Sequence, residues 1–112
     1  MTSLDKAKLV AQVLDDKKAT DVKILEVTKK TSLGDYFVIA TGTSTTHVRS
    51  LSDDVDEALT KQGQEPKRIE GYQSQSWILM DYYDVIVHIF QKETREFYSL
   101  ERLWADAPVV EL

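Results

Sequence analysis

The side chains that usually carry catalysis or bind metals are sparse and dispersed in this 112-residue sequence. It contains no cysteine, which removes thiolate nucleophiles and the sulfur ligands of zinc or iron–sulfur sites. The two histidines, His47 and His88, are far apart and fall in different predicted elements, so they form no H-x-x-x-H ligand pair. No G-x-S-x-G motif places a serine on a nucleophile elbow. The residue types therefore give no positive indication of a metal, a cofactor or covalent catalysis.

The segment from Gly42 to Thr46 is where a phosphate could bind, because it follows a predicted buried strand and precedes a predicted helix. It lacks the lysine and the further glycine of a phosphate-binding loop, and its hydroxyl residues are the usual helix caps, so we favour capping. Nucleotidyl transfer would also need a pair of metal-binding carboxylates on a strand. The acidic residues between Asp53 and Glu57 lie instead on the solvated face of a predicted helix. A nucleotide-dependent transferase that uses the Gly42 to Thr46 turn stays open as an alternative.

Aromatic residues are dense in the C-terminal half of the chain. A domain of this size has limited room to bury every ring, and Trp and Tyr often anchor protein interfaces. We therefore favour an interface for Trp77 and Tyr98, whereas Phe90 and Phe97 fit core positions. His88 shares a predicted strand face with Phe90, and either a hydrogen-bonded, half-buried histidine or a binding-surface group fits that position. The aromatic residues concerned are Tyr72, Trp77, Tyr82, Tyr83, Phe90, Phe97, Tyr98 and Trp104.

Hydrophobic periodicity predicts the elements that would position these side chains. Apolar residues at three- and four-residue spacing predict three helices, and short β-prone runs predict five strands. The last two strands should form an antiparallel hairpin, and the tail from Pro108 to Val110 should follow the final helix. The order implies one α/β domain, residues 1–112, in which a mixed five-stranded sheet is flanked by about three helices. The first predicted helix is capped by Thr2 or Ser3, the second starts within the segment from Gly42 to Thr46, and the third spans Thr94 to Trp104. The predicted strands are Val22 to Val27, Tyr36 to Thr41, Lys67 to Gly71, Ser76 to Asp81 and Val85 to Gln91.

Composition places the chain among ordinary globular proteins, with 42% hydrophobic and 29% charged residues. No apolar run approaches the length of a membrane span, and Met1 to Leu9 lacks the apolar core of a secretory signal, so we expect a cytoplasmic protein. The net charge of -5 disfavours binding that depends on neutralising phosphates, so little direct nucleic-acid contact is expected.

Several segments together resemble the ribosomal silencing factor S family, also called the Iojap family. The likeness is carried by D-Y-F-V-I-A-T-G-T-S-T-T-H from Asp35 to His47, D-V-I-V-H-I-F from Asp84 to Phe90, and R-E-F-Y-S-L-E-R-L-W from Arg95 to Trp104. It also includes Lys17 to Val22, Glu70, Gly71, Trp77 and Asp81, and so covers nearly the whole chain. The resemblance implies a nucleotidyltransferase-like fold without catalytic carboxylates, and a binding protein rather than an enzyme. Tyr83, where the family often has Gly, and Ser74 to Ser76 depart from the family pattern in loops.

The resemblance also implies a partner and a surface. Family members bind protein number fourteen of the large ribosomal subunit, block joining of the small subunit, and lower translation when nutrients are scarce. Help in large-subunit assembly through the same surface is an alternative, and family members can pair into homodimers. Carried over position by position, the binding surface would include Trp77, Asp81, His88, Arg95, Tyr98, Leu100 and Trp104.

Overall fold

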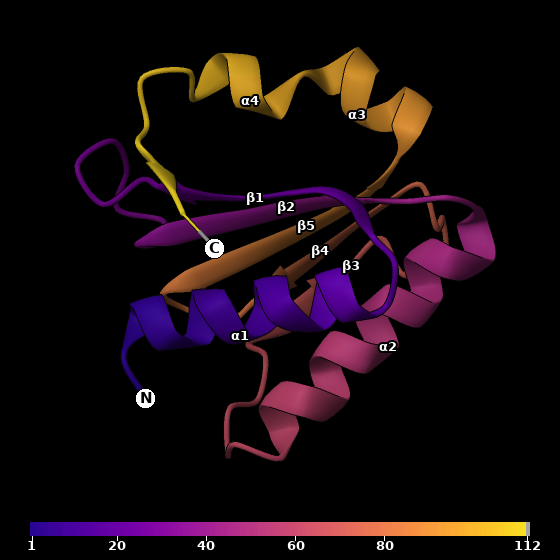
Figure 1. Ribbon diagram of the computed structural model, residues 1–112, viewed down its shortest axis with the longest axis horizontal. Coiled ribbons are helices and arrows are strands. Elements are labelled where there is room, and N and C mark those ends of the chain that lie inside the picture. The colour runs from indigo at the N-terminus through magenta and orange to yellow at the C-terminus, as the bar shows by residue number, and fades with distance from the viewer. Residues whose placement is uncertain (112) are drawn as a thin grey trace.

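The computed structural model describes residues 1–111, and these fold into three layers around a central sheet. Helices α1 (Ser3–Asp16) and α2 (Thr45–Thr60) cover one face of the sheet. The shorter helices α3 (Lys92–Tyr98) and α4 (Leu100–Leu103) cover part of the other face (Figure 1). The predicted α/β domain with helices around a mixed sheet is therefore confirmed. No helix within the described residues is long and apolar enough to cross a bilayer.

The sheet contains six strands within the described residues, in the order β3-β4-β5-β2-β1-β6. β2 and β5 are parallel neighbours, and the other neighbouring pairs are antiparallel, including the predicted β4–β5 hairpin. The predicted strand count of five was one too low, because Val109 and Val110 pair with β1 instead of forming a tail. The strands are β1 (Thr20–Glu26), β2 (Tyr36–Gly42), β3 (Arg68–Glu70), β4 (Trp77–Asp81), β5 (Val85–Gln91) and β6 (Val109–Val110).

The first two helices begin at the capping residues that the sequence indicates. Thr2 accepts a hydrogen bond from the Asp5 backbone and Asp5 accepts one from Thr2, which forms a capping box. Ser44 caps α2 by accepting from the backbone N–H of His47 at 3.0 Å. Most of the apolar stripe of each helix is fully buried against the sheet, together with Ile24, Val38, Ile78, Val87 and Ile89. The buried stripe residues are Ala7, Val10, Ala11 and Leu14 of α1 and Val48, Leu51, Val55 and Leu59 of α2.

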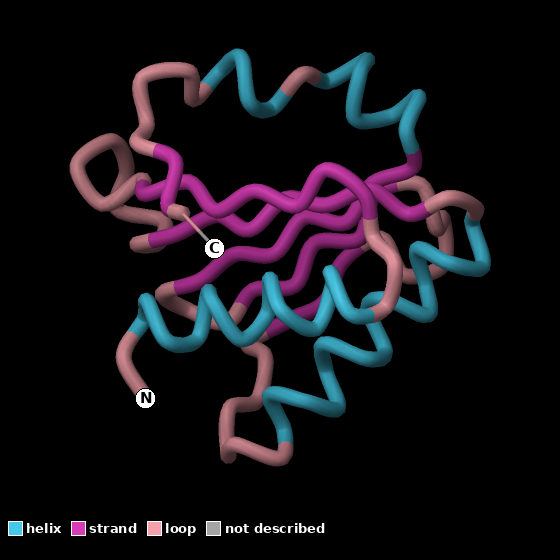
Figure 2. The backbone as a smooth tube through the Cα atoms, viewed as in Figure 1, coloured by secondary structure: helices cyan, strands magenta, loops and turns pink. Residues whose placement is uncertain are grey.

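The predicted single helix from Thr94 to Trp104 is instead broken at Ser99, as the tube in Figure 2 shows. Ser99 has left-handed backbone angles (φ 48°), and its N–H donates to the carbonyl oxygen of Arg95 as α3 ends. The break changes the direction of the chain, so that Leu100 and Trp104 pack against the sheet cluster while Phe97 is 81% exposed. The prediction that Phe97 lies in the core was wrong. Local periodicity could not reveal a break that depends on packing against the sheet.

Candidate protein-binding surface

The sheet face under α3 and α4 carries a second apolar cluster that is rich in rings. Phe37 of β2 and Phe90 of β5 lie at its buried centre. Trp77 and Leu79 of β4 border it and are only partly buried. The two short helices leave this β4 side of the sheet partly exposed to solvent.

Trp77 joins the sheet to α3 through three aromatic neighbours. Its ring centroid lies 4.9 Å from that of Phe90 and 4.9 Å from that of Tyr98. Its indole Nε1 donates a hydrogen bond of 3.1 Å to Nδ1 of His88. These contacts fix the indole, so its remaining exposed area is presented in one orientation.

His88 supports the surface from beneath and is only 4% exposed. Because Trp77 can only donate, Nδ1 of His88 is the acceptor and the neutral ring carries its proton on Nε2. Burial lowers the pKa of His88 to about 4, so the ring is uncharged at neutral pH. Nε2 has no hydrogen-bond partner among the described residues. Of the two expectations for His88, the structure agrees with hydrogen bonding and shows deeper burial than either predicted.

Two exposed rings and an exposed leucine extend this region on the outside of α3 and α4. Phe97 packs edge-on against Tyr98, with 5.1 Å between their ring centroids, and Tyr98 is 55% exposed. Leu103 of α4 is also exposed, close in the chain to Leu100 of the same helix and to Trp104, which follows it. We refer to the following seven residues as the aromatic surface: Trp77, Leu79, Phe97, Tyr98, Leu100, Leu103 and Trp104.

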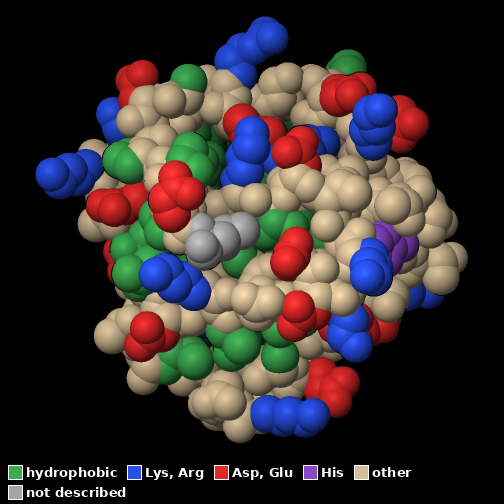
Figure 3. All heavy atoms as spheres, viewed as in Figure 1, with side chains coloured by type: hydrophobic (Ala, Val, Ile, Leu, Met, Phe, Trp, Pro, Cys, Tyr) green, Lys and Arg blue, Asp and Glu red, His purple; other side chains and the backbone are tan. Residues whose placement is uncertain are grey.

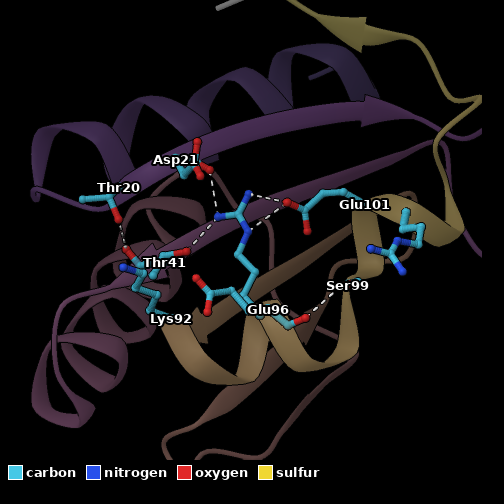
Figure 4. Close-up of a pocket in the computed structure, with 9 residues that line it drawn as sticks. Thr20, Asp21, Thr41, Lys92, Glu96, Ser99 and Glu101 are labelled. Atoms are coloured by element: carbon cyan, nitrogen blue, oxygen red, sulfur yellow. Dashed lines mark hydrogen bonds and ion pairs between the residues drawn. The ribbon is translucent and has the colours of Figure 1, made fainter.

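Arg95, predicted for the binding surface, is 6% exposed and bonded inside the molecule. Its Nη1 donates to the carbonyl oxygen of Asp21 at 2.9 Å and to Oγ1 of Thr41 at 2.8 Å. Its Nε donates to Oε2 of Glu101 at 3.1 Å. Figure 4 shows Asp21, Thr41 and Glu101 arranged around these bonds. Arg95 therefore fastens α3 and α4 to β1 and β2 instead of facing solvent.

Asp81, the other charged residue predicted for the surface, is also buried and has a role in the hairpin. Its Oδ1 accepts from the backbone N–H of Tyr83 at 2.8 Å, and its Oδ2 lies 3.7 Å from Nη2 of Arg68. Tyr83 has a φ of 73°, a backbone conformation that favours glycine, so this bond stabilises the turn. Asp81 lies at the opposite end of β4 from Trp77.

The structure thus brings together five of the seven predicted site residues: Trp77, His88, Tyr98, Leu100 and Trp104. Among the other predicted aromatic residues, Tyr82 is buried under the opposite helical layer and Tyr83 projects from the hairpin. Sequence reasoning missed Leu79 and undervalued Phe97. The alternation of β4 could have revealed Leu79, since it lies two residues after Trp77 and thus on the same face.

The turn from Gly42 to Thr46 uses its polar groups within the chain. The N–H of Thr43 donates to Nδ1 of His47 at 2.9 Å, and Nε2 of His47 donates to the carbonyl oxygen of Lys17 at 2.9 Å. A Cβ on Gly42 would lie 2.7 Å from Cγ2 of Val48, so close packing of strand and helix explains this glycine. The expected capping function is confirmed, and a transferase site at this turn gains no support.

The charged side chains are mixed in the view of Figure 3, where lysines and arginines alternate with aspartates and glutamates. Together with the net charge of -5, this distribution differs from the continuous basic region that a phosphate backbone requires.

Comparisons with known proteins agree in pointing to one family. The family described as "Ribosomal silencing factor during starvation" matches residues 1–112. A ribosomal silencing factor from Halalkalibacterium halodurans is 39% identical over 112 residues, which are 100% of this chain and 96% of the relative. The mouse protein named "Mitochondrial assembly of ribosomal large subunit protein 1" is 30% identical over 99 residues, covering 86% of this chain and 43% of that protein. A crystal structure of a Chromobacterium violaceum protein is similar with a TM-score of 0.91 at 34% identity, covering 94% of this chain and 88% of that one.

Proposed function

This chain belongs to the family of ribosomal silencing factors, and from that membership we propose that it binds the large ribosomal subunit and keeps the small subunit from joining. The family is named for a regulatory effect on ribosomes, which agrees with the expectation of a non-enzymatic protein. The binding energy would come from the aromatic surface, and steric exclusion would be the mechanism.

The observation that supports this proposal is the exposure of packed rings on a rigid support. Tyr98 and Phe97 are exposed although they contact each other, and Tyr98 rests on Trp77, which is itself fixed by His88 and Phe90. Rings held in one orientation lose little conformational freedom on binding. Such side chains at the centre of an interface often contribute most of its binding energy.

Protein number fourteen of the large subunit is the partner that we propose, on the face that meets the small subunit. A protein surface fits the mixed charge and the exposed rings of this chain better than ribosomal RNA does. Occupation of that face in the cytoplasm would lower translation when nutrients are limiting.

Co-sedimentation with isolated large and small subunits tests the first half of this proposal. We expect the protein to sediment with the large subunit alone. Light scattering of subunit joining tests the second half, and we expect a smaller scattering increase when the protein is added first to the large subunits. Binding to neither subunit, or binding without an effect on joining, would contradict the proposal.

Tyr98→Ala tests whether the aromatic surface is the interface. The substitution should weaken large-subunit binding by more than about 1 kcal/mol without unfolding the domain, since Tyr98 is exposed and its removal leaves no cavity. Tyr83→Ala is the matched control, because Tyr83 is 63% exposed but lies in the distant β4–β5 turn. Equal affinities for Tyr98→Ala and the wild type would exclude Tyr98 from the interface.

Help in large-subunit assembly is a second candidate function, which the printed name of the mouse relative favours. The two functions differ in the state of the large subunit. Loss of an assembly factor should lower the number of mature large subunits, whereas loss of a silencing factor should leave this number unchanged and increase subunit joining. Sedimentation profiles of depleted cells distinguish these outcomes.

A homodimer that buries the aromatic surface would compete with ribosome binding. Light scattering across a range of protein concentrations tests this consequence. A monomer mass that does not change with concentration would count against the dimer, and a dimer lost in Tyr98→Ala would support it.

A further inference from the structure

A pocket of about 570 Å³ opens where the two parallel strands of the sheet end. β2 continues into α2 on one face, whereas its neighbour β5 continues into α3 on the opposite face (Figure 1). In open α/β sheets, the crevice at such a change of direction is a favoured place for ligands. The pocket is lined by residues from the ends of β1 and β2 and from α3 and α4, and none of its lining residues belongs to the aromatic surface.

The pocket contains a buried donor atom and a buried acceptor atom that the fold leaves without hydrogen bonds. Nη2 of Arg95 lies 3.0 Å from Oε2 of Glu101 but has no hydrogen bond of acceptable geometry among the described residues. Oε1 of Glu101 likewise has none among them. Leaving such groups unmet in the interior costs free energy, which a molecule that supplies both partners would recover.

The rim of the pocket carries further charges of both signs. Lys92 and Arg102 are exposed cations, and Asp21 and Glu96 are exposed carboxylates. Among the described residues, none of the four takes part in an ion pair with another side chain. Figure 4 shows Lys92, Glu96 and Glu101 around the same opening. Because the rim side chains are exposed, they can move aside to admit a ligand to the buried pair.

We propose that this pocket binds a small zwitterion, a free α-amino acid, whose carboxylate meets Arg95 and Lys92 and whose ammonium group meets Glu101 and Glu96. The argument rests on complementarity. Arg95 and Glu101 form an ion pair through Oε2, but Nη2 of Arg95 and Oε1 of Glu101 still lack hydrogen bonds of acceptable geometry among the described residues. A cationic donor beside an anionic acceptor matches a molecule in which a negative and a positive group are separated by one carbon atom. A simple anion would be attracted by Arg95 but repelled by Glu101. A simple protonated amine would be attracted by Glu101 but repelled by Arg95. The pocket volume of about 570 Å³ leaves room for a side chain.

The test is an amide-resolved NMR titration of the whole chain with L-alanine, L-leucine, L-glutamate and L-arginine. Propionate and ethylamine are the matched controls, since each retains only one of the two charged groups of alanine. We expect saturable shifts of the amides around Arg95 and Glu101 with at least one amino acid, and much weaker binding of both controls.

Variants connect the shifts to the proposed contacts. Glu101→Gln should weaken amino-acid binding by about tenfold, because the charge opposite the ammonium group is lost. Glu96→Gln should weaken it by a smaller factor, and because Glu96 is exposed this variant tests the site without disturbing the Arg95 bonds. Glu65→Gln, in an exposed loop outside the pocket, is the control and should bind as the wild type does.

Other results would overturn the proposal. If propionate or inorganic phosphate binds as tightly as the amino acids, the pocket is an anion site. If no compound causes saturable shifts at millimolar concentrations, ordered water satisfies the buried pair. Neither result affects the proposed binding to ribosomes, which is measured separately by co-sedimentation.

Discussion

The two faces of the central sheet are built differently. Beneath α1 and α2, apolar side chains of both helices and of the sheet are fully buried in one continuous core. Beneath α3 and α4, the helices are short and interrupted at Ser99, and several large apolar side chains remain exposed. The sheet is shared, so the difference lies in how completely each helical layer covers it.

This difference suggests that one face mainly stabilises the fold and that the other is available for binding. The α1–α2 face supplies apolar burial, which is the main stabilising term in folding. The α3–α4 face combines a smaller core with aromatic side chains that are exposed to solvent, and aromatic residues are enriched in protein-binding surfaces. Substitutions on the two faces should therefore separate stability from binding, and the following predictions test that separation from the largest effect on stability to the smallest.

Leu51→Ala on α2 should have the largest effect. Leu51 is fully buried, so its truncation removes apolar contacts and leaves a cavity, at a cost of about 3 kcal/mol. Urea unfolding measures the change in the free energy of unfolding. A change below about 1 kcal/mol would mean that this face is less tightly packed than the structure indicates.

Arg95→Ala should be less costly but still destabilising, by roughly 2 kcal/mol. The substitution leaves Thr41 and Glu101 without the bonds that join α3 and α4 to the sheet, although partial exposure of Glu101 lets water replace some of them. Urea unfolding is again the measurement, with Arg102→Ala as the exposed control on α4. If both variants are equally stable, the Arg95 bonds contribute nothing to folding.

His88 makes the stability of the α3–α4 face depend on pH. Its pKa in the folded protein is about 4 and that of an unperturbed histidine is 6.5, so between these values only the unfolded chain takes up the proton. Stability is therefore complete above pH 6.5 and should fall by roughly 1 to 2 kcal/mol between pH 6.5 and 5. His88→Gln, which retains an acceptor for Trp77, should lose this part of the pH dependence. Urea unfolding at both pH values measures the effect. If the free energy of unfolding falls by the same amount between pH 6.5 and 5 in the wild type and in His88→Gln, the prediction is contradicted.

Phe97→Ala should have the smallest effect on stability, within about 0.5 kcal/mol, because Phe97 is mostly exposed. It should nevertheless weaken large-subunit binding, which Leu51→Ala should not do once the fraction of folded protein is taken into account. Urea unfolding measures the stability of each variant, and co-sedimentation of the folded protein with large subunits measures its binding. A stability loss comparable to that of Leu51→Ala would remove the proposed distinction between the faces.

Part of the aromatic surface could be predicted from sequence because its signals are local. An interface was expected for Trp77 and Tyr98, since a small domain has limited room to bury all of its rings. Tyr98 is 55% exposed, whereas Trp77 is partly buried against the second cluster, and their place in an interface stays a prediction. Arg95 could not be assigned in this way. Its partners, Asp21, Thr41 and Glu101, come from three different elements, and only the folded chain brings them together.

Most of the secondary structure is encoded locally, because the two capped helices, the buried strands and the β4–β5 hairpin follow from periodicity and turn residues within short windows. Four further features arise only in the folded chain: the parallel pairing of β2 with β5, the addition of β6, the break at Ser99 and the internal role of Arg95. Each of these depends on contacts between residues distant in the sequence. Such contacts form when the sheet assembles, and no local pattern encodes them.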